Sequence, residues 1–239
     1  MKLIKFLSVT LLILLLAGRA FAVVARDAVT SGTKTATGTT LTVSHTVTTG
    51  SNLAIVVLCN INSATVTLTA TYAGAAMTAV RDDASGSSSI RNYIFRKLAP
   101  ATGANDWVVT QSAGTAMTCW AISFTGVHQT TPETDHDGAC PASGVASSSL
   151  TLTTATGEIL VDLVALNGTA STALAAGANQ TEELVATENS DESAGSRQAG
   201  ADGGVMSWTW ISNAFYCQSA ASMAAAVVST TPRPPIIIQ

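Results

Sequence analysis

The chain has 239 residues, of which 47% are hydrophobic and only 11% are charged, with 15 acidic residues against 11 basic ones. A chain this poor in lysine and arginine is a weak match for the phosphate backbone of nucleic acids, because that binding depends on many basic contacts. The composition therefore argues against a nucleic-acid partner.

Residues 1–22 have the pattern of a secretion signal. Lys2 and Lys5 precede the apolar run 6–17, and Ala20-Phe21-Ala22 fits the small-x-small rule for cleavage. The run is shorter than the roughly 20 apolar residues that a membrane span needs. We therefore predict an exported chain that starts at residue 23, with a net charge of about −7. It is expected to be secreted or held at a cell surface, without a membrane span.

The composition of the rest predicts a single all-β domain over residues 23–229. Thr, Ser, Ala, Val and Gly are abundant, and β-branched Thr and Val pack well on a pleated surface. No stretch of ten or more residues shows convincing helical periodicity. The mature length is sufficient for one sizeable core.

The strand pattern follows the chain from its first third onward. Residues 40–47 alternate, with Leu41, Val43, His45 and Val47 on one face, which predicts a half-buried strand. Residues 53–59 are continuously apolar and predict a strand covered on both faces. Further strands are expected at residues 23–34, 66–72, 76–81, 90–98, 107–111, 117–124 and 220–226.

The chain repeats itself weakly at an offset of roughly a hundred residues, far beyond the 20–50 residues of a solenoid. The sequence of residues 41–57 resembles that of residues 150–164, and Trp107-Val-Val-Thr corresponds to Met206-Ser-Trp-Thr-Trp210. Two copies of a multi-strand unit suit two duplicated Greek-key halves. The predicted fold is a two-sheet antiparallel β-sandwich that is jelly-roll-like.

Four cysteines in an exported chain predict two disulfides among Cys59, Cys119, Cys140 and Cys217. Three pairings stay open. Cys119 and Cys217 hold corresponding places in the repeat, so they are a candidate pair if their strands are neighbours. The close C-x2-C spacing of a zinc site is absent.

The long polar loop 126–144 is the best metal candidate. Glu133, Asp135 and Asp137 supply several carboxylates from a turning segment, as calcium prefers, although the full EF-hand spacing is missing. The alternative is a solvated loop whose Asp side chains hydrogen-bond their own backbone. Calcium is therefore the only cofactor considered.

Trp208 and Trp210 are two residues apart, so on a strand they point to the same face. Together with Tyr216 they would form a flat platform for sugar rings. The alternative is that both tryptophans belong to the core.

Asp162 interrupts the apolar run 159–164, so its carboxylate must be paired, hydrogen-bonded or at a rim. A structural role is favoured over a functional one. The acidic run 182–192 is interpreted as a solvated face between strands.

The tail 230–239 combines prolines with Ile236, Ile237 and Ile238. Prolines favour an extended conformation that does not continue a sheet. The isoleucines are either an unattached tail or an assembly segment that adds a strand to a neighbouring subunit.

Residues 121–132, read as Ala-Ile-Ser-Phe-Thr-Gly-Val-His-Gln-Thr-Thr-Pro, resemble a family of exported β-sandwich domains from bacteria, phages and environmental sequences. Residues 52–57, 157–162 and 206–210 share the resemblance, which covers residues 40–228. It implies the jelly-roll-like fold and no established catalytic residue. The four cysteines and the Pro/Ile tail depart from that family pattern.

The functional expectation is a non-enzymatic structural or adhesive component of a cell surface, extracellular filament or virion. The chain has no G-x-S-x-G elbow, no H-E-x-x-H and no P-loop. A carbohydrate-binding module is the alternative, and a glycan-active hydrolase is third. The expected partners are further copies of this chain or a surface glycan.

Overall fold

The computed structural model describes residues 22–168, 173–188 and 191–227. These residues form antiparallel strands in four sheets, and their helical content is limited to one 3-10 turn, Gly200–Asp202. The all-β prediction is confirmed. Among the described residues no helix has the length and apolar character required to cross a membrane. The predicted signal up to residue 21 and the tail with Ile236, Ile237 and Ile238 lie outside the described ranges.

The N-terminal half contains two sheets. A five-stranded sheet runs in the order β1-β9-β3-β7-β6, whose strands are Ala25–Lys34, Met117–Thr125, Ala54–Ile61, Arg91–Leu98 and Thr78–Ala84. A four-stranded sheet runs in the order β2-β8-β4-β5, whose strands are Thr40–Val47, Gly103–Gln111, Leu68–Tyr72 and Ala75–Ala76.

The C-terminal half repeats this plan. Its five-stranded sheet has the order β10-β17-β12-β15-β14, formed by His136–Ala139, Tyr216–Met223, Ile159–Leu166, Asp191–Ala199 and Thr181–Glu188. Its three-stranded sheet has the order β11-β16-β13, formed by Val145–Thr151, Val205–Ala214 and Ala175–Ala176.

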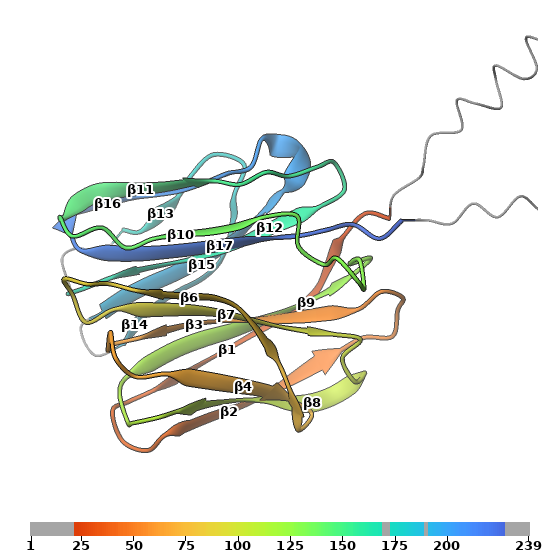
Figure 1. Ribbon diagram of the computed structural model, residues 1–239, viewed down its shortest axis with the longest axis horizontal. Coiled ribbons are helices and arrows are strands. Elements are labelled where there is room, and N and C mark those ends of the chain that lie inside the picture. Colours follow the sequence, from red (N-terminus) through yellow and green to blue (C-terminus); the bar gives the residue numbers. More distant parts are fainter. Residues whose placement is uncertain (1–21, 169–172, 189–190, 228–239) are drawn as a thin grey trace, which may run out of the picture.

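The strand order supports an internal duplication. When the strands within each five-stranded sheet are ranked along the chain, both sheets have the order first-fifth-second-fourth-third, and β2-β8 matches β11-β16. Each half has its own pair of sheets, so four layers lie on top of one another (Figure 1). The prediction had placed both halves in two shared sheets. Face-to-face antiparallel packing is therefore confirmed, whereas the number of sheets is four.

Three cores separate the four layers, and each contains a fully buried tryptophan. Trp107 lies between the two N-terminal sheets, Trp120 between the two five-stranded sheets, and Trp208 between the two C-terminal sheets. The middle core explains the long apolar runs. In β3, Ile55 and Val57 enter the first core while the alternate residues enter the second, so both faces of the strand are covered as predicted.

The predicted half-buried strand is also confirmed. β2 spans Thr40–Val47, with Leu41, His45 and Val47 buried and the intervening threonines exposed. One face of β2 meets the core and the other faces solvent, which is the arrangement that period-two alternation encodes.

The backbone of β15 lies directly against a side chain of the other half at Gly195. A Cβ atom built at Gly195 would overlap the indole ring of Trp120 in β9. Only a residue without a side chain therefore lets the backbone of one half lie against the ring of the other.

Gly195→Ala is expected to destabilise the protein by about 1–3 kcal/mol, because it overpacks the middle core and displaces the Trp120 ring. Urea unfolding monitored by tryptophan fluorescence measures the change. Gly86→Ala is the matched control, because a Cβ at Gly86 meets no atom within 4 Å. Equal stability of both variants would contradict this account of the contact between the halves.

The connection between the halves is more ordered than the predicted loop. Ser222 N donates to Asp135 O at 2.9 Å, and Ala224 N donates to Pro132 O at 2.7 Å, so the segment runs along β17. Its residues His136–Ala139 form the short edge strand β10. The first and last described segments also meet, since Ala22 N donates to Ala226 O at 2.8 Å (Figure 1, at the right).

Candidate functional site

The three aromatic residues predicted as a sugar platform are buried. Trp208, Trp210 and Tyr216 are 0%, 5% and 8% exposed. Trp208 and Trp210 do share one face, as predicted, but that face lies against β12 in the third core. Trp210 Nε1 donates to Val145 O at 2.7 Å, and its ring packs edge-on to Tyr216. This burial corrects the platform prediction, because no ring face is open to a sugar.

The three carboxylates predicted as calcium ligands are used separately. Glu133 forms an ion pair with Arg96 of β7. Asp135 accepts from Thr153 N at 2.8 Å, and Asp137 accepts from the amide of the next residue at 2.8 Å. Among the described residues no group of three or more His, Cys, Asp or Glu side chains is placed to hold a metal. The loop carboxylates are therefore not brought together.

Two disulfides are present, as predicted, and they pair Cys59 with Cys119 and Cys140 with Cys217. Cys59 and Cys119 lie directly opposite each other on the neighbouring strands β3 and β9. The suggested pairing of Cys119 with Cys217 is incorrect, because their strands β9 and β17 belong to different sheets. Corresponding places in a repeat are not adjacent places in space.

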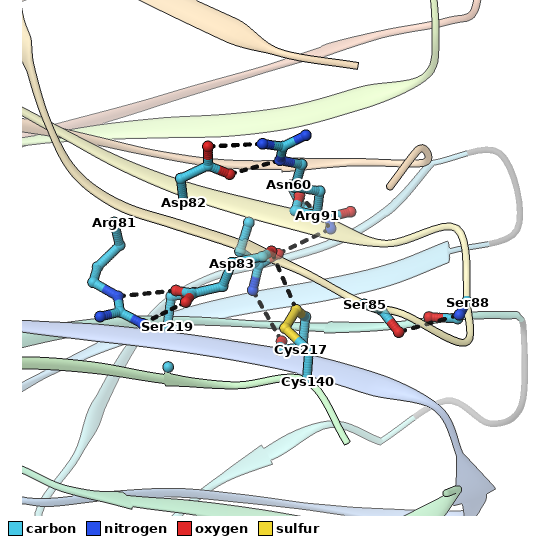
Figure 2. The surroundings of a disulfide bond; sticks show 12 residues. Asn60, Arg81, Asp82, Asp83, Ser85, Ser88, Arg91, Cys140, Cys217 and Ser219 are labelled. Atoms are coloured by element: carbon cyan, nitrogen blue, oxygen red, sulfur yellow. Dashed lines mark hydrogen bonds and ion pairs between the residues drawn. A yellow bond between two sulfur atoms is a disulfide. The ribbon is translucent and has the colours of Figure 1, made fainter. Parts of the chain in front are cut away.

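A polar cluster surrounds the second disulfide where the two halves meet (Figure 2). Asp83 of β6 pairs with Arg81 on its own strand and accepts from Ser219 Oγ of β17 at 2.7 Å. Arg81 Nη1 lies 3.3 Å from Nδ1 of His136 on β10. Cys217 Sγ lies 3.4 Å from Asp83 O. That sulfur carries no proton in a disulfide, so the contact is one of packing rather than a hydrogen bond.

Two buried asparagines of the N-terminal half, Asn60 and Asn92, connect it to the C-terminal half by hydrogen bonds. Asn60 Nδ2 donates to Asn92 Oδ1 at 3.0 Å, and Asn92 Nδ2 donates to Cys217 O at 2.9 Å. Both side chains are at most 4% exposed. Buried side-chain amides are almost always hydrogen-bonded. These two hydrogen bonds therefore fix the register of one half on the other.

Ion pairs stabilise the part of the interface at which β14 contacts β1. Glu183 of β14, 5% exposed at its side chain, bonds Arg26 of β1 at 3.0 Å and also pairs with Arg197. The acidic run was predicted as a solvated face, but Asp191 and Glu192 are also buried, at 5% and 6% exposure. This correction arises because β15 is an inner strand of its sheet.

Asp162 is the most heavily bonded carboxylate in the described chain, and it is 0% exposed. Its Oδ1 accepts from Ser196 N at 3.1 Å and from Ser196 Oγ at 2.6 Å. Its Oδ2 accepts from Trp208 Nε1 at 2.7 Å and from Gln218 Nε2 at 2.9 Å. Three strands of one sheet and one strand of the facing sheet therefore meet on a single side chain.

Burial raises the pKa of Asp162 to about 6, and the hydrogen bonds from Ser196, Trp208 and Gln218 hold it from rising further. The donors that satisfy the carboxylate come from the core itself, and no surface opens onto it. The predicted structural role is what this geometry supports, since a buried carboxylate with four donors is a tie between strands.

His45 lies in a second hydrogen-bonded chain, inside the N-terminal half. Trp107 Nε1 donates to Thr30 Oγ1 at 3.1 Å, which leaves the Thr30 hydroxyl to donate to His45 Nδ1 at 2.9 Å. His45 Nε2 then donates to Ser123 Oγ at 3.0 Å. Ser123 Oγ donates to Asp27 Oδ2 at 2.8 Å.

The pKa values along this chain favour a neutral ring beside an ionised carboxylate. Burial lowers the pKa of His45, and the nearby Asp27 offsets only part of that effect. Burial also acts to raise the pKa of Asp27, but hydrogen bonds from Thr48 and Ser123 outweigh it and leave that pKa below its usual value.

The residue types are those of a catalytic triad, but the arrangement is not. In a triad the histidine accepts the serine proton, whereas here Ser123 donates its proton to Asp27 and accepts one from His45. Ser123 is also 0% exposed, so no substrate carbonyl reaches its Oγ. These hydrogen bonds therefore connect neighbouring strands and serve a structural role.

Sequence reasoning missed Asp83, Asn92 and Ser123 as members of these networks. The available signal was the one used for Asp162, namely a polar residue within an apolar strand, and Ser123 has it, whereas Asn92 follows Arg91 in a strand that also contains Arg96 and Lys97. Asp83 has no such signal, since it follows another aspartate on an edge strand.

The chain was compared with protein-family models, curated proteins and solved structures. No protein-family model, no curated protein and no solved structure matches the chain. The resemblance to exported β-sandwich domains therefore stays a prediction.

Proposed function

We propose that this protein is a non-enzymatic structural or adhesive component that works outside the cell. One observation supports the proposal above the rest. Asp162, His45 and Ser123 are buried and hydrogen-bonded between strands, and the half-buried Asp27 completes the chain that begins at His45. The two disulfides add covalent ties and suit an oxidising compartment.

The positions of the first and last described residues support a component held at a surface. Val24 N donates to Gly157 O and Ala226 N donates to Gly126 O, both at 2.8 Å, and a Cβ at Gly157 would lie 3.6 Å from the Cβ of Ala225. The described part of the mature chain therefore begins and ends at one edge. A body held from that edge presents its remaining surface outward.

Native mass and negative-stain electron microscopy of the purified mature chain, residues 23–239, test the proposal. We expect assemblies larger than a monomer, or retention of the protein on cell surfaces. The matched variant lacks residues 234–239, and it is expected to stay monomeric if the isoleucine tail adds to a neighbour. A monomer that binds no surface and cleaves a glycan would overturn the proposal in favour of a hydrolase.

A Trp208→Ala variant cannot test the carbohydrate-binding alternative. Trp208→Ala would remove core packing and the bond to Asp162, so loss of glycan binding would report unfolding. A glycan array with the unaltered protein is the direct measurement. Strong, selective binding by a monomer would favour that alternative.

A further inference from the structure

A small hollow at the junction of the two halves contains a buried carboxylate with one oxygen that has no hydrogen-bond partner among the described residues. Asn60, Asn62 and Thr118 line it from the N-terminal half, and Asp191 lines it from the C-terminal half, together with Ala116 and Met117. Asn60 and Thr118 are cross-strand partners on β3 and β9, so their side chains leave the sheet side by side. The hollow therefore spans the contact between the five-stranded sheets.

Asp191 is buried, and only one of its two carboxylate oxygens accepts a hydrogen bond from the part of the chain that the structure describes. Its Oδ1 accepts from Gly168 N at 3.2 Å, but its Oδ2 is buried without a hydrogen-bond partner among the described residues. The residue is only 5% exposed. A buried carboxylate oxygen left without a partner is costly, so it calls for a ligand that neutralises it.

The neighbouring groups are oxygen donors. Both hydrogen bonds of the Asn60 side chain use its amide nitrogen, to Asn92 Oδ1 and Arg91 O, so its carbonyl oxygen is the end left for a ligand. Asn62 and Thr118 add a second amide and a hydroxyl. No lysine or arginine is among the described residues that line the hollow. Carboxylate, amide and hydroxyl oxygens are the donors that hard cations prefer.

The size of the hollow restricts the ligand further. It is a narrow hollow with no room for a water-sized sphere, whereas pockets for organic ligands begin at roughly 300 Å³. A single ion fits this scale better than a sugar or a cofactor.

We propose that this hollow binds one calcium ion, which ties the two halves together through Asp191 on one side and through Asn60, Asn62 and Thr118 on the other. The site is distinct from the acidic loop, whose carboxylates do not converge. An exported protein meets calcium at concentrations at which even weak extracellular sites fill.

Thermal unfolding in calcium and in chelator tests the site. With calcium about 100-fold above its dissociation constant, we expect the Tm of the unaltered protein to rise by about 5–10 °C. Asp191→Asn keeps the shape and removes the charge, and it should lose this rise. Asp137→Asn is the control, because that exposed carboxylate caps only its own loop, and it should keep the rise.

Terbium luminescence with the full mature chain supplies a second readout. We expect one ion per chain, lost in Asp191→Asn and weakened in Asn62→Ala, which alters a half-buried residue and so preserves folding. The proposal is overturned if calcium gives no rise, if Asp191→Asn keeps it, or if sodium chloride at matched ionic strength gives the same rise. Loss of the rise in Asp137→Asn alone would place the ion in the acidic loop instead.

Discussion

Asp162→Ala is expected to lower the free energy of unfolding by about 3–5 kcal/mol at pH 7. The substitution leaves Trp208 Nε1 and Ser196 N as buried donors without an acceptor, and each costs about 1–3 kcal/mol. Gln218 Nε2 loses less, because it also donates to Met206 O. Urea unfolding of the purified variant measures the loss.

Asp162→Asn is the matched variant, because it keeps the shape and one oxygen. Its oxygen still accepts from Ser196, while its amide nitrogen faces two donors, so we expect a smaller loss of about 1–3 kcal/mol. If alanine and asparagine were equally tolerated, with changes below about 0.5 kcal/mol, the four hydrogen bonds would not hold the sheets together.

The same residue predicts a pH dependence with a definite sign. The folded-state pKa of Asp162 is raised from 3.8 to about 6, so the folded protein binds more protons than the unfolded chain between those values. Stability from this group is therefore fully present below about pH 4 and falls by about 3 kcal/mol as the pH rises through 6.

The comparison with Asp162→Asn isolates this effect, because both proteins keep His45 and every other titrating group. His45 acts in the opposite direction. Burial lowers its folded pKa, so its contribution is lost as the pH falls through the unfolded value of 6.5. The difference in unfolding free energy between the two proteins should widen from pH 7 to pH 4, and a constant difference would contradict the raised pKa.

Removing either disulfide is expected to cost about 4 kcal/mol. The cysteines of the two pairs are 60 and 77 residues apart, and the chain-entropy model assigns about that value to closed loops of such length. Native domains are stable by only about 5–15 kcal/mol. Cys59→Ala with Cys119→Ala, and Cys140→Ala with Cys217→Ala, should each fold with a lowered Tm, whereas the fourfold variant should be largely unfolded at 37 °C.

The two disulfides should also differ in accessibility to reductant. Cys59 and Cys119 are 0% exposed between β3 and β9, whereas Cys140 is partly exposed beside β10. Mild thiol treatment followed by alkylation and mass spectrometry should label Cys140 and Cys217 first. Simultaneous labelling of all four cysteines would show that reduction needs global unfolding in both cases.

The strands were predictable because their information is local. Thr40–Val47 was predicted with its bounds and its buried face, since alternation is a property of neighbouring residues. The continuous apolar run that forms β3 was likewise predicted to be covered on both faces. The repeat was also visible, and the matching strand orders of the two halves agree with it.

The way in which the two halves pack against each other could not be predicted from local sequence patterns. An apolar strand indicates that both of its faces are covered, but it does not indicate which sheet covers them. The decisive contact joins Trp120 to Gly195, and the tie between Asp83 and Ser219 joins residues 136 positions apart. Such pairs leave no spacing signal in either segment.

Local features of the sequence predict the all-β class, the strand faces, the presence of two disulfides and the need for Asp162 to be bonded. Periodicity, composition and the cost of burying a charge decide those features one segment at a time. The disulfide pairing, the burial of Trp208 and Trp210, and the placement of Asn60 and Asp191 around one hollow were not predictable from local features. These three depend on which sheet faces lie against each other, and that is set by packing among distant residues.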